Sequence, residues 1–494
     1  MSSVFSTLLT PYGYSSGTCG YCSPSGERSK GKTSSKYGMI TSQMTPEFYQ
    51  LLINKGWRRS GDYIYHPDMA RTCCPQYTIR LNTKTFKANK KHRQVINRFN
   101  RYLETGQKPG ESSTSSITDP QGGKQSTSYE EKILKGKGKG KGKNNTNSIG
   151  IIDELHKFEI GYVAEEEEKE LSHRFTTQLV PAKSTKETFE LYKLYQIVIH
   201  KDKPEKITRT GFDRFLCGKT LIQTPINYKM KVDQEIQDGK LPKTYGQYHL
   251  LYKIDGILIG LSVIDILPCC VSSVYFIWHP DWAWASLGKF SALYEISLSE
   301  RMREKGIEEM QWVYMGYWIP DCQKMKYKSE YSPSELLDPG TNTFHLLDIK
   351  LESFLIANPS GYFPFSGIIS SSNSHTSLND STDLAKVKTK GYELSIDSGS
   401  ESEDEAPSSW PVPTPPGFED PSNISDEQLE QVILLMGRNK FTGQGGSLIP
   451  IINLEFRDQE VMYREIKEFL AAVGRDNIAS LINGVADKAI LHFG

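Results

Sequence analysis

The segment that decides the fold spans residues 248–294 and reads YHLLYKIDGILIGLSVIDILPCCVSSVYFIWHPDWAWASLGKFSALY. Three runs rich in apolar residues lie in and beside it, at residues 247–254, 257–267 and 271–278. Asp255 and Gly256 separate the first two runs. An Asp-Gly pair between hydrophobic runs is the strongest short-range hairpin signal, because both residues tolerate positive φ. The segment therefore predicts three consecutive strands, and the first two form a hairpin.

A helix is predicted after Pro280, because the spacing of apolar residues changes there. Apolar side chains recur every three to four residues from Leu287 to Met302, as in an amphipathic helix that packs on a sheet. Another strand is predicted at residues 310–319. This order of elements indicates an α+β fold with a GNAT-like acyltransferase core, which is a mixed sheet with flanking helices.

Length and composition limit the remaining possibilities. The chain has 494 residues, enough for two or three domains, and 8 cysteines, too few for a disulfide scaffold of this size. Residues 1–20 lack the basic and apolar regions of a signal peptide, and the apolar run at residues 257–267 is too short to span a bilayer. We expect a soluble cytoplasmic protein, with a nuclear pool as an alternative, that is a monomer or weak oligomer and binds no membrane.

Changes in composition along the chain divide it into five regions. They are an N-terminal cysteine-motif domain (1–105), a disordered linker (106–150), the core (151–372), a disordered acidic and proline-rich insertion (373–424) and a C-terminal helical part of the core domain (425–494). The Gly-Lys repeat at residues 135–143 cannot bury enough apolar surface to fold. A capping box at residues 425–428 predicts a helix that continues through Met436, and a last helix is predicted at residues 460–473.

Four cysteines of the N-terminal region form two close pairs, Cys19 with Cys22 and Cys73 with Cys74. Four thiols match the ligand number of a tetrahedral zinc ion or of an iron–sulfur cluster, and their spacing does not choose between the two. The alternative is a buried thiol pair beside an unrelated turn.

Residues 80–108 form a basic segment with nine Lys or Arg residues, one acid and interleaved aromatic residues. Such a segment suits a nucleic-acid backbone, because each contact with a phosphate releases counterions. The alternative is a solvated helix face with its aromatic residues packed inward. The candidate nucleic-acid-binding residues are Lys90, Lys91, Arg93 and Arg98.

The strands of the core carry the candidate catalytic residues Asp265, Tyr275 and Tyr317. Asp265 is a carboxylate within an apolar strand, so it could relay a proton, bind a cationic substrate or serve as a buried structural group. The two phenols could donate to an oxyanion or relay a proton, or they could be packed core residues. The turn at residues 279–288 has one glycine and two tryptophans, which argues against the close approach of a CoA pyrophosphate.

Several motifs resemble the eukaryotic arginyl-tRNA–protein transferases. They are Cys19-x-x-Cys22, Gly56-Trp57-Arg58-Arg59-Ser60-Gly61, Thr72-Cys73-Cys74-Pro75-Gln76-Tyr77, Ser262-Val263-Ile264-Asp265-Ile266-Leu267-Pro268, Ser286-Leu287-Gly288 and Met315-Gly316-Tyr317-Trp318-Ile319. The resemblance covers most of residues 19–105 and 170–345. It implies transfer of arginine from arginyl-tRNA to the α-amino group of proteins that begin with Asp, Glu or oxidised Cys, which marks them for ubiquitin-dependent degradation. The alternatives are a non-catalytic module that binds tRNA or acidic N-termini, and a CoA-dependent N-acetyltransferase.

The resemblance also implies roles for further residues. It favours a metal or iron–sulfur centre at the four cysteines, and it requires neither ATP nor CoA, because the arginyl ester is already activated. A cationic cluster after the last predicted strand suits an acidic acceptor residue or tRNA phosphates; its alternative is a charged surface loop. The expected substrate-binding residues are Lys324, Lys326, Tyr327, Lys328, Trp282 and Ser286.

Overall fold

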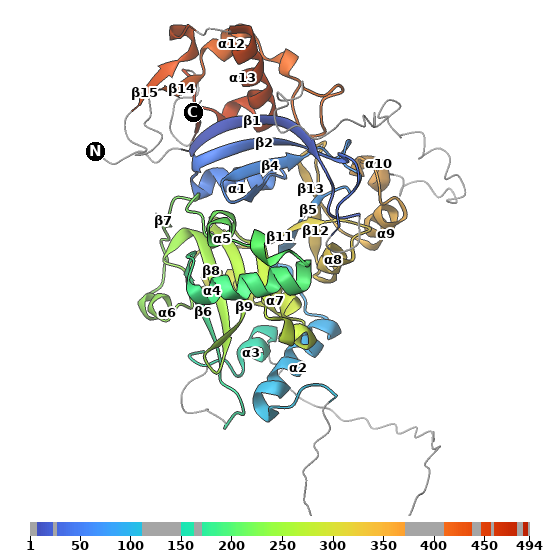
Figure 1. Ribbon diagram of the computed structural model, residues 1–494, viewed down its shortest axis with the longest axis vertical. Coiled ribbons are helices and arrows are strands. Elements are labelled where there is room, and N and C mark those ends of the chain that lie inside the picture. The colour runs from blue at the N-terminus through green and yellow to red at the C-terminus, as the bar shows by residue number, and fades with distance from the viewer. Residues whose placement is uncertain are drawn as a thin grey trace, which may run out of the picture.

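The computed structural model describes residues 7–22, 27–110, 150–162, 170–370, 410–436, 446–455, 459–481 and 488–492. It contains two sheets, one of nine and one of seven strands, with helices on and between them (Figure 1). The helices are α1 (Pro46–Asn54), α2 (Lys90–Thr105), α3 (Ile151–His156), α4 (Lys186–Tyr195), α5 (Arg209–Leu216), α6 (Asp233–Gln237), α7 (Leu287–Glu304), α8 (Gln323–Lys326), α9 (Ile349–Ala357), α10 (Phe365–Ser370), α12 (Asp426–Glu430) and α13 (Gln459–Val473). None of the helices within these ranges is long and apolar enough to cross a bilayer.

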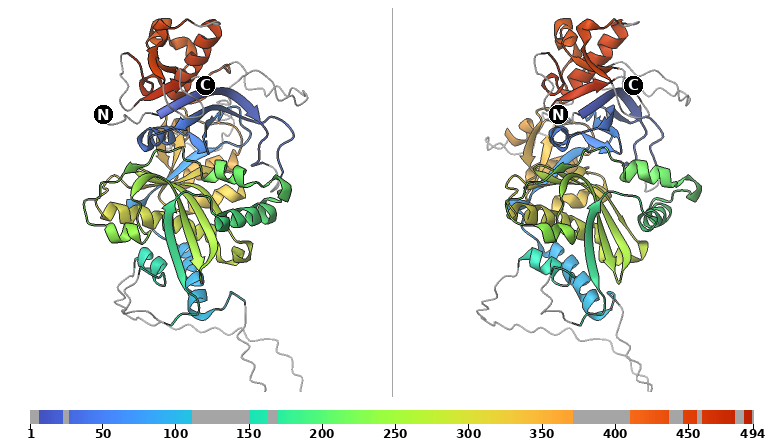
Figure 2. Two further views of the ribbon diagram at one scale, coloured as in Figure 1. Left: turned by 60° about the vertical axis from the view of Figure 1, so that its left-hand side comes forward. Right: turned by 90° about the vertical axis from the view of Figure 1, so that its left-hand side faces the viewer.

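The nine-stranded sheet forms the centre of the molecule (Figure 2). Its strands run in the order β13 (Thr343–Leu346), β12 (Ser334–Asp338), β5 (Tyr77–Asn82), β11 (Trp312–Trp318), β10 (Cys270–Trp278), β9 (Ile257–Leu267), β8 (Thr244–Ile254) and β6 (Phe175–Pro181), with β7 (Thr224–Pro225) beside β8. The predicted hairpin is confirmed: β8 and β9 pair antiparallel, and Asp255 and Gly256 turn between them with φ of 50° and 82°. The three predicted strands, the helix after Pro280 and the strand near residues 310–319 are all present.

Helices cover both faces of the central strands. Alternate residues of β9 point to opposite faces: Leu261 and Val263 pack in a cluster with α4 and α5, whereas Ile264 and Ile266 belong to the larger cluster that contains α7. Helix α7 packs on β10 and β11. The apolar residues that recur at helical spacing from Leu287 to Met302 are buried in this contact, as the sequence predicts.

Strands β10 and β11 are parallel neighbours only at their beginnings. Their pairing runs from Cys270 opposite Trp312 to Ser272 opposite Tyr314, and no pairing follows, although both strands continue. An irregularity between Ser273 and Tyr275 turns β10 away at this point. The two strands therefore diverge, and the sheet opens between them.

The seven-stranded sheet combines the two ends of the described chain. Its order is β15 (Ser447–Pro450), β14 (Ile433–Met436), β16 (Ala489–His492), β1 (Thr7–Gly17), β2 (Ser34–Gln43), β4 (Tyr63–Pro67) and β3 (Arg58–Ser60). Helix α1 begins at the N-cap Thr45 and lies between this sheet and β9 (Figure 1). Its buried residues share a hydrophobic cluster with Leu267 and Tyr314 of the central sheet, so the two sheets are joined by one core.

The C-terminal region differs from its predicted helical structure. The capping box at Ser425 is present and the helix at residues 460–473 is confirmed as α13, but α12 ends at Glu430. Residues 433–436 instead form β14 between β15 and β16. A short run of consecutive apolar residues fits either a buried helix or a buried strand, and here long-range pairing decides for the strand.

The structure also differs from the predicted division into regions. Strand β5, from the N-terminal region, pairs with β11 in the central sheet, and α2 packs on α7. Part of the predicted disordered insertion is ordered, because Trp410 and Phe418 pack against Tyr37 and Trp57. The acidic run at residues 165–168, most of the linker (111–149) and residues 371–409 of the insertion lie outside the described residues.

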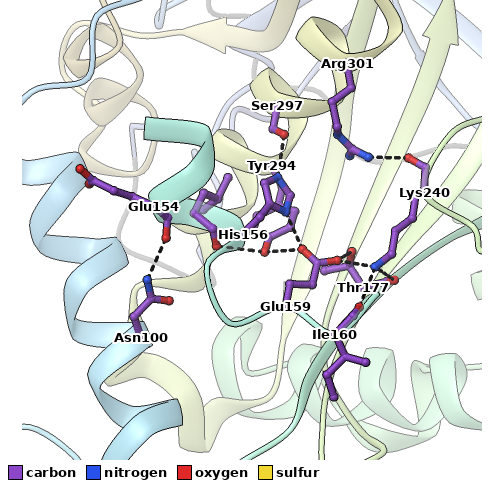
Figure 3. Close-up of polar contacts among 11 residues, drawn as sticks. Asn100, Glu154, His156, Glu159, Ile160, Thr177, Lys240, Tyr294, Ser297 and Arg301 are labelled. Atoms are coloured by element: carbon purple, nitrogen blue, oxygen red, sulfur yellow. Dashed lines mark hydrogen bonds and ion pairs between the residues drawn. The ribbon is translucent and has the colours of Figure 1, made fainter. Parts of the chain in front are cut away.

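A buried polar network fixes the segment that begins with α3 (Figure 3). Glu159 accepts hydrogen bonds from Tyr294 (2.9 Å), Lys240 (2.6 Å) and Thr177, and its carboxylate lies 2.6 Å from Nδ1 of His156. These groups lower the pKa of Glu159 far below its usual range against the opposing effect of burial. The network holds α3 beside α2, where Asn100 donates to the Glu154 carbonyl.

Candidate functional site

A cavity of about 1030 Å³ lies where β10 and β11 diverge. Residues 272–276 of β10 and 315–317 of β11 form its floor, and the N-terminal half of α7 forms one wall. The other walls come from residues 58–60 of β3, from the end of α4 and from residues 323–330 after β11. Segments more than 250 residues apart in the sequence therefore meet at this cavity.

Cationic side chains dominate the charged lining of the cavity. They are Arg58, Arg59, Lys289, Lys324, Lys326 and Lys328, against the carboxylates Glu295, Glu330 and Glu352. Positive charge concentrated around a concave surface attracts anionic ligands, because the low-dielectric walls focus the field.

Arg59 is held by Asp265 behind the cavity wall. Its Nε and Nη2 donate to the two carboxylate oxygens at 2.8 and 2.5 Å, and the side chains are 1% and 0% exposed. Burial raises the pKa of Asp265, and Arg59 opposes that shift. Asp265 itself does not line the cavity, so the structure places this predicted catalytic carboxylate as the partner that orients Arg59.

Arg58 lies on the opposite side of the same strand segment and also reaches the cavity. Its Nη1 donates to the Trp57 carbonyl at 2.8 Å, and its guanidinium group lies 5.2 Å from the centre of the Tyr317 ring. Cation–π contacts of this kind hold a guanidinium group in place while its charge remains available.

Lys328, which is half-buried, and Glu295, which is buried, are ionisable groups of the cavity lining. Lys328 donates to the Tyr317 carbonyl at 2.7 Å, and burial lowers its pKa to about 7. Glu295 is 1% exposed and accepts a hydrogen bond from Ser273 at 3.2 Å. Burial raises the pKa of Glu295 to about 8.

The two predicted catalytic tyrosines both line the cavity. The Tyr275 hydroxyl lies 3.0 Å from Nε2 of His200, and the Tyr317 hydroxyl donates to the Gly56 carbonyl at 3.2 Å. His200 ends the π-helical turn Gln196–His200 that continues α4. The Tyr317 hydroxyl therefore already has an acceptor, whereas the Tyr275 hydroxyl shares its hydrogen bond with a titratable ring.

The predicted substrate-binding residues divide into two groups. Lys324, Lys326, Tyr327, Lys328 and Ser286 line the cavity. Trp282 does not line it, because its ring packs against Phe99 and Tyr102 of α2.

Helix α2 carries the predicted nucleic-acid-binding residues, and two of them contact residues that line the cavity. Arg98 donates to the Ser286 hydroxyl at 2.8 Å, and Lys91 and Lys289 share the carboxylate of Glu330. Lys90 is exposed. Arg93 instead pairs with Glu154 of α3, further from the cavity.

The four N-terminal cysteines meet beside the cavity. Their sulfur atoms all lie within 4.8 Å of one another, with 3.8 Å between Cys22 and Cys73 and 4.0 Å between Cys73 and Cys74. An S₄ set around one zinc ion with Zn–S bonds of about 2.3 Å has sulfur separations of about 3.8 Å. The thiols therefore have the number and spacing to bind a metal. Tyr21, between Cys19 and Cys22, packs against the cysteine cluster and also lines the cavity.

Sequence reasoning missed several cavity residues. Arg58 and Arg59 stood inside a quoted motif, so two adjacent arginines before a buried strand were a usable signal. Glu295 had only a weak signal, an acid between apolar residues on the inner face of a predicted helix. Ser273 lies in a serine pair, Ser272-Ser273, that also belongs to the family resemblance, but neither Ser273 nor His200 has a local signal for its role, because both roles depend on contacts across the fold.

Comparisons with known proteins agree with this geometry. Two family models match, "Arginine-tRNA-protein transferase, N terminus" at residues 17–94 and "Arginine-tRNA-protein transferase, C terminus" at residues 187–338. The two models therefore cover the cysteine pairs and the diverging strands.

Curated relatives match over most of the chain. Arginyl-tRNA–protein transferase 1 of Drosophila melanogaster is 30% identical in an alignment of 414 positions, gaps included, that covers 68% of this chain and 81% of the relative. Arginyl-tRNA–protein transferase 1 of Dictyostelium discoideum is 29% identical in an alignment of 538 positions, gaps included, that covers 70% of this chain and 84% of the relative. An aspartate/glutamate leucyltransferase of Campylobacter jejuni is 38% identical over 90 residues, 18% of this chain and 35% of the relative. With the cysteine cluster and the cationic cavity in place, these matches assign the chain to the arginyl-tRNA–protein transferase family, a family of aminoacyltransferases.

Proposed function

We propose that this protein transfers arginine from arginyl-tRNA to the N-terminal α-amino group of proteins that begin with Asp, Glu or oxidised Cys. The observation that carries the proposal is the cationic cavity between β10 and β11, in a chain of this family. Its volume of about 1030 Å³ suits an aminoacyl group together with the first residues of a peptide.

The acceptor side chain binds to the arginines and lysines of the cavity. Arg58 brings a guanidinium group to the cavity wall, and Arg59 lies beside it with its Nε and Nη2 bound by Asp265. A guanidinium group matches the geometry of a carboxylate or a sulfonate. Lys324 and Lys326 add positive charge from the segment after β11. Asp265 supports this role by fixing the orientation of Arg59 from behind.

The tRNA approaches along α2. The basic residues of this helix lead to Ser286 at the start of α7, and Ser286 lines the cavity. Phosphates on α2 would place the 3′ end of the tRNA at the cavity, where Tyr275 and Tyr327 offer aromatic faces to the terminal base.

The reaction is the aminolysis of an ester. The neutral α-amine attacks the arginyl carbonyl carbon, a C–N bond forms, and the bond to the ribose oxygen breaks. The ester is already activated, so the reaction requires neither ATP nor CoA. Two bound and oriented substrates remove much of the barrier, about 7–11 kcal/mol at best. The mixed sheet with α7 against its diverging strands supports a GNAT-like core for this chemistry.

The cysteines hold a single tetrahedral ion such as zinc, as judged from their sulfur separations. An iron–sulfur cluster distributes the four thiolates over two or four iron atoms, so it would need some of the sulfurs to move apart. In either form the centre cross-links the segment after β1 to the segment before β5, and thereby fixes Tyr21 in the cavity wall.

Label transfer tests the proposal. The purified protein is mixed with [³H]arginyl-tRNA and peptides that differ only in the first residue. Label should pass to peptides that begin with Asp or Glu, and peptides that begin with Gly or Lys should stay unlabelled. Leucyl-tRNA is the matched donor control, because one relative is named an aspartate/glutamate leucyltransferase. Binding without transfer, or equal transfer from leucyl-tRNA, would contradict the proposal.

A further inference from the structure

Glu295 differs from the other carboxylates of the cavity. Glu330 forms ion pairs with Lys91 and Lys289, and Glu352 is partly exposed on α9. Glu295 is 1% exposed, lines the cavity from the inner face of α7, and has no ion pair within 4.0 Å in the described part of the chain. A buried carboxyl group without a cation is costly to ionise, so a fold that retains one at a cavity surface has a use for it.

Several elements that lie around this part of α7 contribute polar or ionisable groups near Glu295. Ser273 of β10 donates to its Oε1, and the hydroxyl of Ser262 on β9 also stabilises its charged form. The neighbouring ionisable groups are Tyr252 of β8, Tyr327 and Lys328 of the segment after β11, and Tyr331. The Nζ of Lys328 is occupied by the Tyr317 carbonyl, so it acts on Glu295 through its charge.

We propose that Glu295 accepts the proton that the attacking α-amine loses during arginyl transfer. This inference rests on the proposed function. The amine nitrogen forms its bond to the arginyl carbonyl carbon and gives one proton to the Glu295 carboxylate. The ribose oxygen leaves with the electrons of the broken C–O bond and takes up that proton, which returns Glu295 to its starting form. No other reactant is consumed.

The position of Glu295 fits this role better than that of Asp265. Both oxygens of Asp265 are bound by Arg59, and Asp265 does not reach the cavity. Glu295 lines the cavity beside Ser273, at the place where β10 leaves β11.

The acidity of Glu295 supports the proposal. Burial raises its pKa to about 8, which is near neutral pH. A group with a pKa near the working pH combines a usable fraction of its proton-accepting form with a good driving force for proton transfer.

The test compares Glu295→Gln with wild type under saturating arginyl-tRNA and Asp-peptide. Glutamine resembles the neutral carboxyl group that dominates near pH 7, so we expect the variant to fold. The expected result is a fall in kcat of about 10²–10⁴-fold, with KM for both substrates within threefold. Glu300→Gln, which removes a carboxyl group of the same helix α7 that does not line the cavity, is the matched control and should keep its kcat.

A second variant distinguishes a proton acceptor from a structural residue. Ser273→Ala removes a hydrogen bond to the charged form of Glu295, so the rise of kcat with pH should shift to higher pH than in wild type. The α-amine is the same in both enzymes and cannot cause such a shift. A Glu295→Gln enzyme with kcat within threefold of wild type, or an unshifted profile in Ser273→Ala, would overturn the inference while leaving the proposed function intact. A wild-type enzyme that transfers nothing would overturn both.

Discussion

The buried pair of Arg59 and Asp265 allows a quantitative prediction. The two side chains are 1% and 0% exposed and are joined by two hydrogen bonds. The substitution Asp265→Asn keeps the shape of the side chain but removes its negative charge. The guanidinium group of Arg59 then stays buried without a counter-charge. Removing one partner of a buried pair typically costs about 3–5 kcal/mol. We expect a loss of this size in the free energy of unfolding.

Urea unfolding followed by circular dichroism measures the effect. A double-mutant cycle with Arg59→Met and Asp265→Leu isolates the interaction energy of the pair from the other contacts of the two side chains. The double variant leaves no unpaired buried charge, because both charges are removed. The double variant should therefore be more stable than Asp265→Asn. Glu187→Gln is the control, since its pair with Lys253 in the same sheet is 42% and 27% exposed and should contribute less than 1 kcal/mol.

Two outcomes would refute this reasoning. One is a loss below 1 kcal/mol in Asp265→Asn, and the other is strict additivity in the cycle. The same variant should raise KM for an Asp-peptide more than for arginyl-tRNA, because Arg59 lines the cavity and Asp265 orients it. Equal changes in the two KM values would exclude Arg59 from acceptor binding.

Three further predictions concern the metal site, α2 and the network of Figure 3. Cys73→Ser should lower metal content and transferase activity together, measured by elemental analysis and label transfer, and wild-type metal content would exclude this thiol as a ligand. Neutralising Lys90, Lys91 and Arg93 together should weaken tRNA binding and flatten its dependence on salt, and an unchanged salt slope in filter binding would remove α2 from the interface. Burial lowers the pKa of His156, so the unfolded chain binds a proton at this ring more readily than the folded protein does; stability should therefore fall as the pH drops below about 6.5. Urea titrations at pH 7.5 and 5.5 check this, and an equal loss of stability in His156→Gln would contradict it.

The parts of the fold that the sequence predicts well are those that depend on neighbours in the chain. The Asp255-Gly256 turn, the strands on either side of it and α7 follow from local spacing and turn chemistry. The seven-stranded sheet does not, because β1 pairs with β16 across more than 470 residues and no local pattern records that partner. The same limit explains why residues 433–436 were predicted as helix, although they form a strand between β15 and β16.

The candidate site shows the same division at the level of single side chains. The sequence predicts the four cysteines as ligands because the two members of each pair are close together in the chain. Folding only has to bring the two pairs together. Asp265 was recognised as unusual because a carboxylate within an apolar strand needs a partner, but its partner Arg59 lies 206 residues away. The sequence leaves open whether Asp265 is a reacting group or a buried structural group. Only the fold decides this, because it shows that Arg59 is the partner of Asp265. A buried charge must be compensated, and Asp265 compensates that of Arg59, which lines the cavity. Glu295 also lines the cavity, but among the described residues it has no ion pair within 4.0 Å and feels the charge of Lys328 only at longer range, so it is the carboxyl group that remains available to accept a proton.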